Sequence, residues 1–229
     1  MDLIIIDLKR RGYSETLEIQ RDLQKLRIDE KIGDVLLIVE HDAVLTMGTR
    51  GKDSNVLADE QILKEMGIDI AWVERGGDVT YHGPGQMVGY PIINLENFGK
   101  DIRRYISNLQ DVIINVLKDK YDVIGEKQTG EQTGIWIKNE KITAIGISIK
   151  KWITMHGFAF NINTDLSHFD LIVPCGLSGT GVTSVEKLTG QKADYGQIVK
   201  LVIDEFLKVF GYTARYMRLD ELMESINEG

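Results

Sequence analysis

The sequence predicts an α+β fold built on a mixed or antiparallel β-sheet. Segments with the pattern of strands follow one another in runs, and few helical segments separate them, whereas a doubly wound parallel sheet would alternate strands with helices. The chain has 229 residues, of which 43% are hydrophobic and 27% charged, a composition typical of a globular domain with a sizeable core. No repeat, low-complexity segment or linker divides it, so we expect residues 1–229 to form one domain.

The first part of the chain combines short apolar runs with two helical patterns. The apolar runs predict strands at residues 3–8, 35–39, 44–47 and 68–73. A helix is predicted at residues 14–27, with Ser14 as its N-cap. A shorter helix is predicted at residues 58–66, where Gly67 ends it.

The second part contains two long amphipathic helices, at residues 101–121 and 195–210. The first has apolar residues at the helical spacing, namely Ile102, Tyr105, Ile106, Leu109, Ile113, Val116 and Leu117. Strands are predicted at residues 87–95, 134–138, 141–150 and 153–163, with Asn139 and Glu140 as a hairpin turn. Residues 218–227 have the pattern of a polar helix or a frayed tail.

Residues 75–90 form a glycine-rich stretch between two predicted strands. Five of these sixteen residues are Gly, and Arg75, Thr80, His82 and Gln86 are polar groups among them. Glycine lets the backbone approach a ligand closely or adopt a positive φ. A plain turn is the simpler interpretation, but the density of polar groups favours a binding loop. It is not a nucleotide P-loop, because no Gly-Lys-Ser/Thr follows and the next segment is a strand.

Cys175 is the only cysteine of the chain. A free Cys is usually a small buried hydrophobe. Here Pro174 precedes it and Gly176, Gly179 and Gly181 follow, which predicts a loop, where reactive groups gather.

A nucleophilic Cys needs a neighbour that favours its thiolate, because the free thiol has a pKa of about 8.5. The candidates are the four histidines and one lysine: His41, His82, His156, His168 and Lys141. Alternation with period two places Lys141 on one strand face with Thr143, Ile145, Ile147 and Ile149. There it either loses solvent, which favours the neutral amine, or reaches water past the apolar face.

The opposite face of the same predicted strand consists mostly of small residues: Ile142, Ala144, Gly146 and Ser148. The next strand alternates likewise, with Gly157, Ala159, Asn161 and Asn163 against His156, Phe158, Phe160 and Ile162. Two neighbouring faces of small residues predict the floor of a slot for a ligand.

Composition excludes several classes of function. The formal net charge is −8, which disfavours nucleic acid and anionic membranes as partners. No apolar run approaches the roughly 20 residues of a membrane span, and the N-terminus lacks a basic region typical of a signal peptide. The lone Cys excludes an internal disulfide, so we expect a cytoplasmic protein. No ligand spacing predicts a metal, and no cofactor is expected.

Taken together, these motifs resemble the lipoyl(octanoyl) transferases, the octanoyl-acyl-carrier-protein:protein N-octanoyltransferases of lipoate synthesis. The family pattern R-G-G-x-x-T-aromatic-H-x-x-G-Q-x-aliphatic-x-Y is met at residues 75–90. Its other motifs are met at 40–48 (E-H-x-x-V-x-T-x-G), 141–146 (K-I-x-A-I-G), 156–161 (H-G-x-A-x-N), 174–176 (P-C-G) and 181–184 (G-V-T-S). The resemblance covers about residues 35–190, and Thr133 departs from it where Pro is expected.

The resemblance implies that Cys175 is the acyl-accepting nucleophile and Lys141 the base that activates it. It implies an acyl site lined by Arg75, Gly76, Gly77, Asp78, Val79, Thr80, Tyr81, His82, Ala144, Ile145, Gly146, Gly157, Phe158 and Ala159. The implied fold is that of the biotin/lipoate protein ligase catalytic domain, a mixed or antiparallel sheet with a smaller sheet and packed helices.

The implied activity is ping-pong transfer of an octanoyl group through a thioester on Cys175. The implied donor is octanoyl-acyl carrier protein, and the acceptors are a lysine of the lipoyl domains of 2-oxoacid dehydrogenases and of the glycine cleavage H protein. A monomer is expected. The alternatives are an ATP-dependent lipoate or biotin protein ligase, a cysteine hydrolase and a non-catalytic acyl-binding module.

Overall fold

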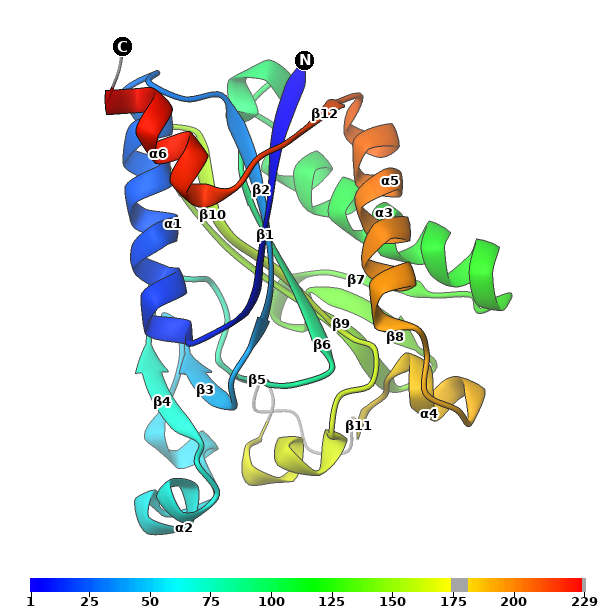
Figure 1. Ribbon diagram of the computed structural model, residues 1–229. Coiled ribbons are helices and arrows are strands. Elements are labelled where there is room, and N and C mark those ends of the chain that lie inside the picture. The colour runs from blue at the N-terminus through cyan, green and yellow to red at the C-terminus, as the bar shows by residue number, and fades with distance from the viewer. Residues whose placement is uncertain (174–180, 228–229) are drawn as a thin grey trace.

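The structure is a computed structural model that describes residues 1–173 and 181–227 (Figure 1). Its larger sheet has nine described strands: β1 (Asp2–Arg11), β2 (Asp34–His41), β6 (Gln86–Ile92), β7 (Glu126–Gln128), β8 (Gly134–Ile137), β9 (Glu140–Lys150), β10 (Ile153–Asn161), β11 (Gly181–Val182) and β12 (Thr213–Tyr216). The order is β12, β1, β2, β6, β10, β9, β8, β7, with β11 beside β9. β1 pairs parallel with β2 and β12, whereas β6, β10, β9 and β8 pair antiparallel, which confirms the predicted mixed sheet.

A smaller sheet lies at the lower end of the view in Figure 1. It consists of β3 (Val44–Met47), β4 (Asp69–Trp72) and β5 (Val79–His82), in the order β4, β3, β5. A 3-10 turn, η1 (Asp53–Asn55), and helix α2 (Glu60–Glu65) connect β3 to β4. The sequence prediction missed β5, which interrupts the glycine-rich stretch, because its four residues are too few to stand out between glycines.

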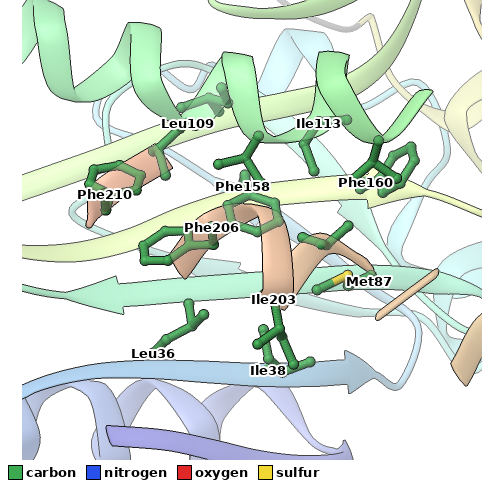
Figure 2. Packing of buried hydrophobic residues seen from close by; sticks show 14 of the residues in the cluster. Leu36, Ile38, Met87, Leu109, Ile113, Phe158, Phe160, Ile203, Phe206 and Phe210 are labelled. Atoms are coloured by element: carbon green, nitrogen blue, oxygen red, sulfur yellow. The ribbon is translucent and has the colours of Figure 1, made fainter. Parts of the chain in front are cut away.

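Helices cover both faces of the large sheet (Figure 1). α1 (Tyr13–Ile28) and α6 (Leu219–Asn227) pack on one face, and α3 (Ile102–Tyr121) and α5 (Tyr195–Phe210) on the other. Figure 2 shows the core between the large sheet and helices α3 and α5. The helices contribute Leu109, Ile113, Ile203, Phe206 and Phe210, and the sheet contributes Leu36, Ile38, Met87, Phe158 and Phe160. Because Phe158 and Phe160 face α3 and α5, the residues that alternate with them on β10, namely Gly157, Ala159 and Asn161, face the other way.

The helix ends follow local capping chemistry. Asp101 caps α3 by accepting from the Arg104 N–H at 2.9 Å, and Asp194 caps α5 by accepting from the Gln197 N–H at 3.0 Å. One expectation was wrong, because α1 begins at Tyr13 without a side-chain cap and Ser14 is therefore not its N-cap. Ile102 belongs to the apolar stripe of α3 but is 40% exposed as the first residue of the helix.

The remaining short elements are α4 (Val185–Thr189), η2 (Leu95–Phe98), η3 (Gly130–Gln132) and η4 (Leu166–Leu171). The predicted C-terminal helix is present as α6. Among the described helices, none is long and apolar enough to cross a membrane.

The hairpin between β8 and β9 differs from the predicted one by a single residue. The strands end at Ile137 and resume at Glu140, so the turn residues are Lys138 and Asn139, and Lys138 has a positive φ of 56°. Ile135 pairs with Thr143 but Trp136 pairs with Lys141, which makes a β-bulge at the intervening residue of β9. The alternation along β9 is therefore displaced between Lys141 and Thr143.

Candidate active site

A cavity of about 220 Å³ lies between the glycine-rich stretch and the strands β9, β10 and β11. It brings together most of the residues that the sequence motifs single out, although those motifs are far apart in the chain. The predicted site residues that line it are Arg75, Gly76, Gly77, Asp78, Thr80, His82, Lys141, Ala144, Ile145, Gly146, Gly157, Phe158 and Ala159.

Val79 and Tyr81 do not line the cavity with their side chains. Both are almost fully buried in a separate cluster with Leu45 and Phe169. The reason is the strand β5, whose period-two alternation turns them away from the face of Thr80 and His82.

Arg75 anchors the glycine-rich stretch to the small sheet. Its Nη2 donates to the Thr46 carbonyl at 2.6 Å and to the Thr46 Oγ1 at 2.9 Å, and its side chain is buried. The stretch also contacts β9, where the Gly76 N–H donates to the Ile147 carbonyl at 3.0 Å. A Cβ on Gly146 would lie 2.8 Å from the Gly76 carbonyl oxygen, so glycine at 146 admits the loop backbone as well as a ligand.

His82 is held by a chain of side-chain amides. Its Nδ1 is 2.8 Å from the Gln86 Oε1, the Gln86 Nε2 donates to the Asn161 Oδ1 at 2.9 Å, and the Asn161 Nδ2 donates to the Thr183 carbonyl at 3.0 Å. The Thr183 carbonyl can only accept, so Asn161 must turn its NH2 group toward it and its oxygen toward the Gln86 NH2 group. This leaves the Gln86 oxygen facing His82, so the His82 Nδ1 must carry the hydrogen. Burial, with a contribution from nearby His41, lowers the pKa of His82 well below 6.5, so the ring is neutral and its Nε2 is an acceptor.

The four histidines do not share one site. His82 and His156 line the cavity, whereas His41 bonds the Tyr90 hydroxyl at 2.8 Å and His168 bonds the Tyr81 hydroxyl at 2.8 Å outside it. Both ring nitrogens of His156 are buried without a hydrogen-bond partner in the described part of the chain. Burial lowers the pKa of His41 and of His156 to about 4.

Lys141 lines the cavity near the start of β9. The bulge places Ile142 in the same helix-covered core as Ile145, so Lys141 lies with Ala144 on the cavity side. The expectation that Lys141 shares the face of Ile145 was therefore wrong. Its Nζ lies 5.0 Å from the centre of the Trp136 ring.

Cys175 lies in residues 174–180, outside the described residues. The described residues on either side of it are fixed. The Val173 N–H donates to the Asn55 carbonyl at 2.8 Å, and Asn55 bonds the cavity residue Asp78. On the other side, Val182 pairs with Lys141 and lines the cavity. The second flank thus lines the cavity, and the first is linked to it through Asn55 and Asp78.

Several cavity residues were missed by sequence reasoning, among them Tyr13, Val88, Tyr90 and Trp136. Trp136 was hidden by the one-residue error in the hairpin turn, since the actual turn brings it opposite Lys141. Across residues 1–173 and 181–227, no group of three or more His, Cys, Asp or Glu side chains is placed to hold a metal ion.

The fold is that of the lipoate-protein ligases. Lipoate-protein ligase A solved with bound ATP superposes with a TM-score of 0.78 over 100% of this chain and 93% of that chain, at 16% identity. A bipartite lipoate protein ligase from Thermoplasma acidophilum, solved in a study of that ligase and its E2 lipoyl domain, gives a TM-score of 0.73 over 99% and 90% of the two chains, also at 16% identity.

Sequence comparison narrows this class. The chain belongs to the lipoyl protein ligase A/B catalytic domain family, whose sequence model matches residues 12–207. The octanoyltransferase of Caldicellulosiruptor saccharolyticus is 48% identical over 99% of this chain and 96% of its own length.

Proposed function

We propose that this chain is an acyltransferase that moves an octanoyl group from octanoyl-acyl carrier protein to a lysine of a lipoyl domain, the first step of protein lipoylation. The observation that carries the proposal is the cavity, which is lined by an apolar strand face and has Lys141 beside the strand that follows Cys175. Identity of 48% to an octanoyltransferase over almost the whole chain supports it over ATP-dependent ligation, since the ligases share only 16%.

In the proposed mechanism, the Cys175 Sγ gives its proton to the Lys141 Nζ and attacks the thioester carbonyl of the donor. The bond from carbonyl carbon to carrier sulfur breaks, and Lys141 returns the proton to the departing thiol. Backbone N–H groups around Cys175 and Gly176 stabilise the oxyanion in this proposal. The product is an octanoyl thioester on Cys175.

The second half-reaction uses the same base. The acceptor lysine has an ordinary pKa of about 10.4, so it arrives as an ammonium and must lose a proton before it attacks. Lys141, neutral again, accepts that proton, and the amine displaces the Cys175 thiolate and releases its second proton to solvent as the amide forms. The thiolate then regains its proton from Lys141, which closes the cycle.

The remaining predicted site residues form the walls of the acyl site in this proposal. Arg75, Thr80 and His82 come from one side, and the stretches 144–146 and 157–159 from the other. Val79 and Tyr81 act by packing behind the wall. His82 positions the wall and is not the base in this proposal, because burial lowers its pKa well below 6.5 and makes its Nε2 a weak base.

The proposal takes residues 1–229 as one cytoplasmic catalytic domain. Its acceptors are lipoyl domains, and we extend them to those of the 2-oxoacid dehydrogenases and to the glycine cleavage H protein.

The test is an intact mass of the protein after mixing with octanoyl-acyl carrier protein, without ATP, before and after adding a lipoyl domain. We expect one octanoyl adduct that disappears as the lipoyl domain gains it. A requirement for ATP, with full activity in Cys175→Ala, would identify a ligase. Release of free octanoate without an acceptor would identify a hydrolase, and absence of any adduct would leave only acyl binding.

A further inference from the structure

Trp136 covers the side chain of Lys141 from the neighbouring strand. The two residues are paired across β8 and β9, and the Lys141 Nζ lies 5.0 Å from the ring centre, within the roughly 6 Å range of cation–π attraction. Trp136 is buried and lines the cavity.

The orientation of the indole ring is fixed independently of Lys141. The Trp136 Nε1–H donates to the Gln132 carbonyl at 3.0 Å, at the end of η3. The turn at Lys138 and Asn139 pairs Trp136 with Lys141, and the β-bulge directly after this pair shifts the rest of the ladder, so that Ile135 pairs with Thr143 instead of Ile142.

The backbone of Lys141 is held from its other side. Val182 of β11 pairs with Lys141, and the Thr183 N–H donates to the Lys141 carbonyl at 3.0 Å. Lys141 thus sits between two strands with its main chain fixed, and the aromatic face limits where its Nζ can lie.

A ring face attracts an ammonium and has little attraction for a neutral amine. In the transfer proposed above, Lys141 becomes an ammonium whenever it takes the proton of the Cys175 thiol. We propose that Trp136 is a positioning residue that holds the Lys141 ammonium in this state and so favours the ionised Cys175. This inference rests on the proposed function and assigns Trp136 no contact with the reacting atoms.

Two substitutions separate the ring face from packing. Trp136→Phe and Trp136→Leu both remove the indole N–H and part of the volume, but only Trp136→Phe keeps an aromatic face. Trp152→Leu is the matched control, because the Lys100 Nζ lies 5.6 Å from the centre of the Trp152 ring. Trp152 belongs to the turn between β9 and β10, at the opposite end of β9 from Lys141.

The measurement is the rate of Cys175 alkylation by iodoacetamide as a function of pH, beside single-turnover acylation by octanoyl-acyl carrier protein. Trp136→Leu should lower the alkylation rate at pH 7 by on the order of tenfold and move its profile to higher pH. Trp136→Phe should recover most of that loss, and Trp152→Leu should match the unsubstituted protein. The acylation rate should fall in Trp136→Leu while KM for the carrier protein stays unchanged.

An unshifted profile in Trp136→Leu would overturn the inference, as would equal shifts in Trp136→Leu and Trp136→Phe, which would indicate packing alone. Circular dichroism checks folding, and Trp136→Met replaces the leucine variant if that variant unfolds. Failure of the proposed function itself is distinct, because the unsubstituted protein would then form no octanoyl adduct.

Discussion

Acidification should destabilise this protein through its buried histidines, and His156 allows a direct test. Burial lowers the pKa of His41 and of His156 from 6.5 to about 4, and lowers that of His82 well below 6.5. These rings are neutral in the folded chain but become protonated in the unfolded chain below pH 6.5. The stability they contribute is therefore fully present above about pH 6.5 and is lost as the pH falls toward about 4.

The magnitude follows from the size of the shift. One pKa unit corresponds to about 1.4 kcal/mol, so a histidine shifted from 6.5 to about 4 should cost about 2 kcal/mol of unfolding free energy between pH 7 and pH 5. His156→Asn removes one such group. Asn does not titrate and tolerates the positive φ of 58° at this position better than most residues.

The assay is urea unfolding of both proteins at pH 7 and pH 5. His156→Asn should lose about 2 kcal/mol less than the unsubstituted protein over this interval, whatever its stability at pH 7. Shared losses from carboxylates cancel in this difference. Equal losses in the two proteins would show that His156 is hydrated or already protonated in the folded state, and would refute the reasoning.

Three further substitutions test the site. Lys141→Ala should leave the Cys175 thiol with the ordinary pKa of about 8.5, so that alkylation and acylation become slow at pH 7 and recover partly at pH 9. Lys141→Arg should not restore either rate, because a guanidinium group cannot accept a proton. A pH profile like that of the unsubstituted protein would remove Lys141 from the mechanism. His82→Gln should lower the single-turnover rate on the order of tenfold yet leave Cys175 alkylation intact, and a loss of thiol reactivity as large as in Lys141→Ala would make His82 the base. Gly157→Ala should lower the free energy of unfolding by about 1–3 kcal/mol, because its Cβ would lie 2.1 Å from the Gly89 carbonyl oxygen. The measurement is urea unfolding, and an unchanged free energy would mean that β6 and β10 separate easily.

Long periodic elements could be predicted from the sequence because their signals are repeated many times. α5 has the predicted bounds, and α3 differs only in its cap, since each has an apolar residue at every turn and an Asp at its start. Short elements gave no such repetition. β5 and β11 have four and two residues, and their pairing is set by tertiary contacts with β3 and β9.

The composition of the site could likewise be predicted from its motifs, but the direction of its side chains could not. Motif matching treats residues 75–82 as a continuous wall, whereas alternation along β5 removes Val79 and Tyr81 from the cavity. The small residues predicted as a floor for the ligand are partly explained by packing, as Gly146 admits the Gly76 backbone.

The position of Lys141 shows most clearly what period-two reasoning lacks. Uninterrupted alternation places it with Ile145, on the face that α3 and α5 cover. One extra residue in β9 moves it to the opposite face, beside Ala144. A bulge leaves no mark in hydropathy, because Ile142 has the apolar character of an ordinary strand residue. The extra residue sets the face of Lys141 relative to the rest of β9, whereas the turn at Lys138 and Asn139 pairs Lys141 with Trp136. Deleting Ile142 should therefore restore regular pairing and leave Lys141 beside Ala144 and opposite Trp136. We expect this variant to acylate Cys175 at pH 7 but to lose stability, because a side chain buried in the helix-covered core is removed. Loss of acylation at pH 7 in a folded variant that keeps Cys175 alkylation at high pH would show that the bulge itself is needed to position Lys141.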